Sequence, residues 1–189
     1  MKFVSLIVLT LTIFAVSAVA QSGPRTLSFV ASASIGDVPN DGSVRSRTVE
    51  SEPRLSPTEL AERAVFTFMN SERASRGLLP LEWSDEIAAV ARMHSRNMAD
   101  NNFFSHQGLD GLLVDERADR SGLSGWTAIG ENIAFMRGIP DPAKTVVEKW
   151  LQSASHRDNL LAARWKQSAI GVAITADGTI YFTQVFMTR

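Results

Sequence analysis

Apolar residues recur at helical spacing in the segment that follows Ser56-Pro57. The residues of this apolar face are Leu60, Ala61, Ala64, Val65, Phe68 and Met69. Ser56 is suited to cap a helix, Pro57 to fill its first position, and Gly77 to follow its end. The pattern therefore predicts a helix that begins at Pro57 and ends before Gly77.

A second helix is predicted after Ser84, because Asp85 and Glu86 would lie in its first turn, where carboxylates complement the helix dipole. Its apolar stripe is formed by Ile87, Val90, Ala91, His94 and Met98. Because His94 falls on this stripe, we interpret it as a hydrogen-bonded core histidine rather than a ligand.

Two shorter helical segments follow. The first covers residues 114–120 and ends at Gly122. The second opens at Asp141-Pro142, and a helical turn over residues 156–161 comes after it. The apolar line of the second segment is Ala143, Val146, Val147, Trp150 and Leu151.

Three segments favour β-strands, namely residues 126–136, 169–174 and 180–187. Ala176-Asp177-Gly178 between the last two is a strong hairpin signal. Both alternating sets of positions in these two strands are apolar, so both faces of their sheet must be covered. We therefore predict an α+β fold, a three-layer α/β/α sandwich with a small, mainly antiparallel central sheet.

The first twenty residues resemble a secretory signal peptide, with Lys2, an apolar run over residues 3–16, and the small residues Ala18-Val19-Ala20 before Gln21. A membrane-spanning helix needs about 20 apolar residues, which is more than this run provides. We predict cleavage near Ala20 and a mature protein, secreted to the extracellular space or periplasm, with no stable membrane span.

Residues 21–55 are predicted to be a flexible linker. This segment contains seven Ser, three Gly and three Pro among 35 residues, and its four Arg balance four acidic residues. It has no helical or strand period and no basic excess. The folded domain is therefore assigned to residues 56–189.

Composition removes several classes of function. The 189 residues are enough for one domain, and 19 Lys and Arg against 20 Asp and Glu give a net charge of −1. This balance offers no basic surface for nucleic acid. Because the chain has no cysteine, disulfides, thiolate zinc sites and cysteine nucleophiles are excluded.

Five pieces of sequence occur in a characteristic order. They are Asn70-x-x-Arg73-x-x-x-Gly77-Leu78-x-Pro80-Leu81-x-Trp83; Ala91-Arg92-x-His94-Ser95-x-x-Met98 with Phe103-Phe104-Ser105-His106; Gly130-Glu131-Asn132-Ile133-Ala134; Trp150-Leu151-x-Ser153-x-x-His156-Arg157-x-Asn159-Leu160-Leu161; and Ile170-Gly171-Val172 with Tyr181-Phe182-x-Gln184-Val185-Phe186. In this order they resemble the CAP (SCP) domain of the cysteine-rich secretory, antigen 5 and pathogenesis-related proteins, in its cysteine-free bacterial branch. The resemblance covers residues 57–189.

The resemblance implies a cleft that holds two His and two Glu in relatives and takes a divalent metal in some of them. His106 matches the first histidine, Glu131 the glutamate of the Gly-Glu-Asn motif, and His156 the second histidine. The second glutamate lies three residues after the helical tryptophan in relatives. Ser153 occupies that position here, so it is a cleft residue without a carboxylate.

Two imidazoles and one carboxylate form a possible ligand set for zinc or another divalent cation, and an open fourth position is typical of catalytic zinc sites. His106, Glu131 and His156 are therefore candidate metal ligands. Against catalysis, they come from three separate segments, and Ser153 replaces the carboxylate best placed to act as a general base. An equally weighted alternative for Glu131 is a carboxylate that caps backbone N–H groups or pairs with a histidine.

The other polar residues of the motifs receive structural interpretations. Asn70, Arg73, Asn132 and Asn159 are expected to bond loop backbone. Arg117 and Arg157 could line an anionic pocket, but they are expected to pair with acidic residues at the surface. A Ser-His-acid triad is not predicted, because the chain has no G-x-S-x-G elbow.

Two classes of function follow. The first is a secreted, non-enzymatic binding module for a lipid-like or cell-envelope ligand, as sterol and fatty-acid binding in relatives suggests. The alternative is a zinc-dependent, protease-like hydrolase that uses His106, Glu131 and His156. The missing carboxylate at Ser153 favours binding, no catalytic residue is assigned, and a monomer is expected.

Overall fold

The computed structural model describes residues 54–189. The predicted signal peptide over residues 1–20 and nearly all of the predicted linker over residues 21–55 lie outside the described residues and stay predictions. Within residues 54–189, every helix is too short or too polar to cross a bilayer.

Five helices and four strands make up the described part of the chain. They are α1 (Pro57–Ala74), β1 (Glu82–Trp83), α2 (Asp85–Asp100), α3 (Val114–Arg120), β2 (Ala128–Arg137), α4 (Pro142–Gln152), α5 (Ala154–Leu161), β3 (Gln167–Ile174) and β4 (Thr179–Thr188). The predicted helices and strands are all present. The last helix begins at Ala154, two residues before the predicted turn.

The four strands form one sheet in the order β1-β3-β4-β2. β3 and β4 are antiparallel and joined by the predicted hairpin, and β4 is also antiparallel to β2 along its whole length. The two-residue strand β1 runs parallel to β3 and was missed by sequence analysis, because two residues carry no alternation. The sheet is thus mainly antiparallel, and β2 is an edge strand.

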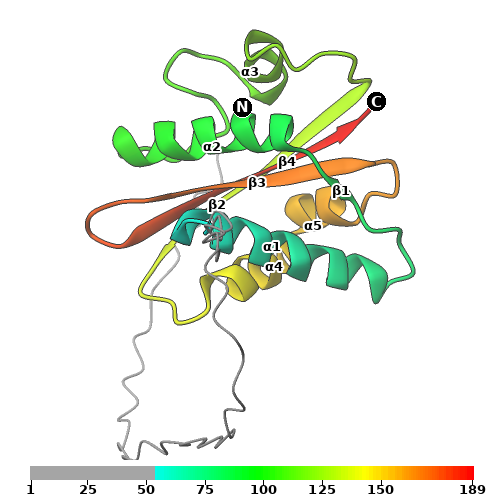
Figure 1. The fold of residues 1–189 in the computed structure, drawn as a ribbon, viewed down its shortest axis with the longest axis horizontal. Helices are drawn as coiled ribbons and strands as arrows, with labels where there is room; N and C mark the ends of the chain where they lie inside the picture. Colours follow the sequence, from blue (N-terminus) through cyan, green and yellow to red (C-terminus); the bar gives the residue numbers. More distant parts are fainter. Residues whose placement is uncertain (1–53) are drawn as a thin grey trace, which may run out of the picture. The chain divides into compact units, whose positions relative to one another are not determined.

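Helices cover both faces of this sheet (Figure 1). α2 and α3 lie on one face, and α1, α4 and α5 lie on the other. We call these the upper and lower faces, as Figure 1 shows them. The predicted three-layer α/β/α sandwich is confirmed.

The helix starts follow from their capping residues. Ser56 Oγ accepts the Glu59 N–H at 3.3 Å, and the Glu59 carboxylate accepts the Ser56 N–H at 2.8 Å, which completes a capping box. Ser84 caps α2 through the Ile87 N–H at 3.3 Å. These side chains satisfy N–H groups that a helix leaves without partners.

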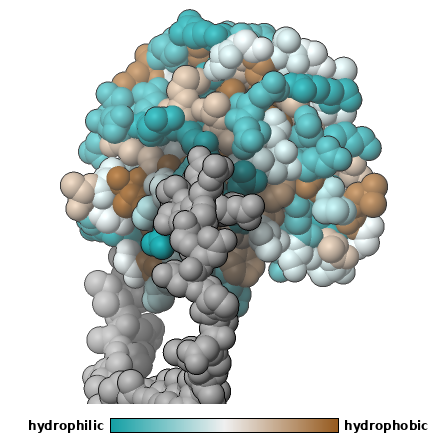
Figure 2. All heavy atoms as spheres, viewed as in Figure 1, coloured by the Kyte–Doolittle hydropathy of each residue, from teal (hydrophilic) through white to brown (hydrophobic). Residues whose placement is uncertain are grey.

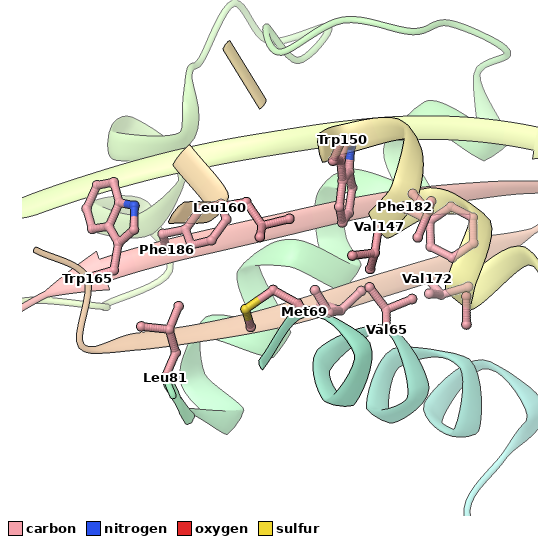
Figure 3. Packing of buried hydrophobic residues seen from close by; sticks show 13 residues of the cluster. Val65, Met69, Leu81, Val147, Trp150, Leu160, Trp165, Val172, Phe182 and Phe186 are labelled. Carbon is pink, nitrogen blue, oxygen red and sulfur yellow. The ribbon is translucent and has the colours of Figure 1, made fainter. Parts of the chain in front are cut away.

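Large apolar side chains fill the space between the sheet and the helices of the lower face (Figure 3). Trp150, Phe182 and Phe186 are at most 1% exposed. Full burial of a side chain such as Leu or Phe contributes about 1.5–3 kcal/mol to folding. On the outer surface, hydrophobic residues are scattered among hydrophilic ones on the side seen in Figure 2.

The upper face brings a helix into direct contact with the sheet and holds several buried polar groups. α2 lies directly on β3 at Gly171, where an added Cβ would be 2.1 Å from the Arg92 nitrogen. Ser95 Oγ donates to the Gly171 carbonyl at 2.9 Å and also contacts Thr183 Oγ1 at 2.9 Å. This contact fixes the position of α2, and therefore of the loop that follows it.

Candidate functional site

Two of the predicted site residues meet above the edge strand β2. His106 lies in the loop over residues 101–113, between α2 and α3, and Glu131 lies on β2. His106 Nδ1 is 2.8 Å from Glu131 Oε1. The His106 side chain is 49% exposed and that of Glu131 only 3%, so the buried carboxylate orients an accessible ring.

Arg117 on α3 holds the same carboxylate from the other side. Its Nη2 donates to Glu131 Oε2, and its Nη1 donates to the carbonyls of His106 and Leu112, each at 2.8 Å. Arg117 thus pairs with an acidic residue as predicted, but its side chain is 3% exposed, so the predicted surface location is wrong. The helical spacing of Val114, Arg117 and Ala118, which places Arg117 on the buried side of α3, was the signal available in the sequence.

His94 is fully buried below the loop, as its place on the apolar stripe predicted. Its Nε2 lies 2.9 Å from the carbonyl oxygen of Ser105, the residue that precedes His106. Burial lowers the pKa of His94. A neutral ring whose Nε2 donates to this carbonyl is the state that fits the site.

His156 belongs to a different layer. It lies on α5, below the sheet, and its Nδ1 is 2.8 Å from Ser153 Oγ. Burial, followed by the charge of His106, lowers the pKa of His156. The two histidines are therefore close enough to interact electrostatically, but the hydrogen-bond partner of His156 is Ser153 and not Glu131.

Two asparagines, Asn132 on β2 and Asn159 on α5, join this strand to this helix. Asn132 Nδ2 donates to the His156 carbonyl at 3.1 Å, and Asn159 Nδ2 donates to the Glu131 carbonyl at 3.1 Å. Asn70 exchanges two bonds with the backbone of Leu81 at 2.8 and 3.0 Å. Arg73, which is 1% exposed, donates three hydrogen bonds to backbone carbonyls. All four side chains bond backbone as predicted, but the partners of Asn132 and Asn159 lie in α5 and β2 rather than in loops.

The three candidate metal ligands do not form a common ligand set. Within residues 54–189, no three His, Asp or Glu side chains are grouped so that they would hold a metal ion. Both carboxylate oxygens of Glu131 are already bonded, one to His106 and one to Arg117. Glu131 thus fits the role of a residue that orients a ligand better than that of a ligand.

A cavity of about 420 Å³ opens beside the His106–Glu131 pair, between α3 and β2. Its lining residues are His106, Leu113, Val114, Asp115, Trp126, Ile129 and Glu131. Trp126 is partly exposed, and its Nε1 donates to Asp119 at 3.0 Å. The lining thus combines apolar side chains with the polar groups of His106, Asp115 and Glu131, a combination that periodicity in the sequence did not reveal.

A second cavity, of about 520 Å³, lies between α1, α2 and the end of β3. It contains the buried carboxylate of Glu62, which accepts Arg92 Nε at 2.9 Å and the Val172 N–H at 3.1 Å. These bonds join the two helices to β3 and satisfy the buried charge. We therefore interpret the polar groups of the larger cavity as structural, and we place the candidate site in the smaller cavity.

Comparison with known proteins identifies the family of this chain. Residues 66–186 match the model of the cysteine-rich secretory protein family, CAP. This match spans more than half of the chain, so the protein belongs to the CAP family. Its lack of cysteine fits the cysteine-free bacterial branch.

The similar curated proteins include two from Bacillus subtilis strain 168. The uncharacterized protein YkwD is 34% identical over 143 residues, which cover 76% of this chain and 52% of YkwD. The uncharacterized membrane protein YlbC is 32% identical over 146 residues, which cover 77% of this chain and 40% of YlbC. The chain thus spans about half the length of the curated relatives it matches.

Solved structures share the fold. An extracellular protein of Bacillus anthracis that contains an SCP domain is 29% identical, with a TM-score of 0.60 over 73% of this chain and 45% of that one. An outer surface protein of Borrelia burgdorferi is 23% identical, with a TM-score of 0.64 over 71% of this chain and 96% of that one. The second likeness shows the fold alone.

Proposed function

We propose that this protein is a secreted binding module that takes a small amphipathic ligand in the cavity between α3 and β2. Secretion is supported by the signal-like sequence over residues 1–20 and by the similar Bacillus anthracis protein, which is described as extracellular. The observation that carries the proposal is the cavity itself. Its volume of about 420 Å³ falls in the range of small-molecule sites.

The lining of the cavity indicates the chemistry of the ligand. Leu113, Val114, Trp126 and Ile129 offer an apolar wall for a hydrocarbon body. His106 stands at the polar end, with Nδ1 bonded to Glu131 and Nε2 on the opposite side of the ring. A neutral imidazole that donates through Nδ1 accepts a hydrogen bond at Nε2. This favours a ligand with a hydroxyl head.

The charges around the cavity separate an alcohol from a fatty acid. The Glu131 charge is balanced by Arg117, whereas Asp115 adds a carboxylate to the lining. A ligand carboxylate would be repelled by Asp115, and a neutral hydroxyl would not. We therefore expect a hydroxylated, lipid-like molecule in preference to a fatty-acid anion.

A titration of the protein with 1-decanol, followed by tryptophan fluorescence, tests this proposal. Trp126 lines the cavity, so binding should change its emission, and Trp126→Phe should remove that change. Decanoate at the same concentration should bind more weakly, because its charge meets Asp115. Equal binding of decanoate would contradict the assigned ligand class.

Two leucine variants provide a matched pair. Leu113 is 47% exposed and lines the cavity, whereas Leu79 is 78% exposed and does not. Leu113→Asp should abolish the decanol response, because it places a charge against the hydrocarbon. Leu79→Asp adds the same charge away from the cavity and should leave the response unchanged. Decanol binding that is unchanged in both variants would refute this location of the site.

A divalent cation such as zinc is a separate proposal with a narrower basis. His106 and His156 would hold it through ring nitrogens, and Glu131 would orient His106, as carboxylates do for metal-bound histidines. Zinc would supply a Lewis acid at the polar end of the cavity. Two protein ligands are one fewer than a catalytic zinc site ordinarily has, so the hydrolase alternative receives no support from this geometry.

A further inference from the structure

The guanidinium of Arg117 joins three parts of the site. It donates to the carbonyls of His106 and Leu112, each at 2.8 Å, and to the carboxylate of Glu131. The two carbonyls mark the ends of the loop segment over residues 106–112, and Glu131 belongs to β2. Because the guanidinium is a rigid planar fork, these bonds fix the loop and the strand relative to each other.

This arrangement determines how the His106 ring is presented. Arg117 holds the backbone of His106 directly, and it holds the ring indirectly through Glu131, whose Oε1 is 2.8 Å from Nδ1. An ionised carboxylate only accepts hydrogen bonds. A neutral His106 ring must therefore carry its proton on Nδ1 and leave Nε2 bare.

We propose that Arg117 is a positioning residue that sets the Nδ1–H tautomer of His106 through its three bonds. Arg117 does not line the cavity and its side chain is 3% exposed, so it acts through His106 and Glu131 rather than by contact with a ligand. The value of this tautomer rests on the proposed function, because the bare Nε2 is the atom that would accept the hydroxyl of the ligand.

His94 supplies an internal reference for the tautomer. Its Nε2 faces the Ser105 carbonyl, which only accepts, so a neutral His94 carries its proton on Nε2. His94 and His106 are therefore expected in opposite tautomers within one molecule. Because the chain has three histidines, their ring signals can be assigned with one substitution each.

Long-range ¹⁵N–¹H correlation spectra of histidine-labelled protein at pH 8 test the proposal, because an imidazole is ordinarily neutral at that pH. The unsubstituted protein should show His106 protonated on Nδ1. Arg117→Met should move His106 to a mixture in which the Nε2–H form predominates. Arg120→Met is the matched control, because Arg120 lies on the same helix and pairs with Asp110 of the same loop at 3.0 Å, but is exposed. Its spectrum should be unchanged.

Arg117→Lys keeps the charge beside Glu131 but cannot make the three bonds of a guanidinium. It should shift the His106 tautomer in the same direction as Arg117→Met, by a smaller fraction. Arg117→Lys also carries the test if Arg117→Met does not fold. An unchanged His106 tautomer in either folded variant overturns the proposal.

The spectra are recorded without ligand, so they separate the two proposals. A tautomer shift in Arg117→Lys together with failure of decanol to bind the unsubstituted protein would refute the proposed function and support the positioning role. Decanol binding together with an unchanged tautomer would support the function and overturn the positioning role.

Discussion

The two faces of the central sheet differ in the apolar side chains that pack against them and in their relation to the candidate site. On the lower face, α1, α4 and α5 pack large apolar side chains such as Trp150, Phe182 and Phe186 against the strands. On the upper face, α2 and α3 combine small side chains with buried polar ones, among them His94, Arg117 and Glu131. Both faces bury apolar area and polar groups, but the large aromatic side chains lie on the lower face and the polar group of the candidate site lies on the upper face.

This difference predicts different effects of substitutions on the stability of the fold and on the geometry of the candidate site. Substitutions on the lower face should lower the free energy of unfolding and leave the ligand response of the folded protein unchanged. Substitutions in the polar group of the upper face should change both. The predictions below test this division, beginning with the largest effect.

Trp150→Ala should cost about 3–5 kcal/mol of unfolding free energy, because it removes a fully buried aromatic side chain and leaves a cavity. Urea unfolding measures this loss. Trp126→Ala should cost less, because Trp126 is only partly buried, but it should abolish the response to decanol. Equal destabilisation by the two variants would contradict the division between the faces.

Glu131→Gln should cost about 1.5–3 kcal/mol, the range for hydrogen bonds to charged groups. His106 and Arg117 bond different oxygens of the carboxylate, and in glutamine one of these becomes an NH2 group that cannot accept, so one of the two bonds is lost. Glu62→Gln, at the other buried carboxylate, should cost a similar amount, because Glu62 also accepts several bonds. Only Glu131→Gln should weaken decanol binding, which calorimetric titration of both variants would measure.

Lowering the pH below about 6.5 should destabilise the fold. Burial lowers the pKa of His94, and burial together with the charge of His106 lowers the pKa of His156. The unfolded chain then binds more protons than the folded one. The contribution of these histidines to the free energy of unfolding is fully present above the unfolded histidine pKa of about 6.5. It is lost as the pH falls from there towards the lower pKa values of the folded protein.

The slope of this loss is at most about 1.4 kcal/mol per pH unit for the fully buried His94, and His156 adds a smaller part. Urea unfolding at pH 7.5, 6.5 and 5.5 measures it. His156→Gln should reduce the slope without abolishing it. A free energy of unfolding that is the same at pH 7.5 and pH 5.5 would rule out the neutral, buried state of His94.

Zinc should have the smallest effect. At five times its Kd, a ligand that binds only the folded protein stabilises it by about 1 kcal/mol. Protons compete for the imidazoles, so zinc should raise the melting temperature more at pH 7.5 than at pH 5.5. The double variant His106→Ala and His156→Ala should lose this gain. Equal stabilisation of the double variant would place the ion elsewhere.

The layers of the fold could be predicted from local patterns. Ser56, Ser84 and Asp141 identified helix starts because capping depends on the side chain and on neighbours within four residues. The hairpin of β3 and β4 had a local turn signal as well. β1 could not be found, because its pairing with β3 joins residues 82–83 to residues 167–168 and has no local signature.

The site was only partly predictable for the same reason. The motif residues identified His106 and Glu131, whose side chains meet. The burial of Arg117 was not predicted, because an arginine on a short helix is ordinarily solvated, and only the loop carbonyls and Glu131 make its burial favourable. The layer in which His156 lies, opposite to that of His106, depends on the packing of α5 and not on spacing in the sequence.

The position of β4 inside the sheet has a consequence for the time course of folding. β4 is the last of the four strands along the chain, yet it lies between β3 and β2, and β2 has β4 as its only neighbour in the sheet. Glu131 lies opposite Val185 in the sheet, so β2 can pair at this position only after β4 has been synthesised. Pairings between distant segments form slowly, because the loop must close first. We therefore expect the candidate site to be among the last parts of the described chain to assemble, because Glu131, which orients His106, lies on β2.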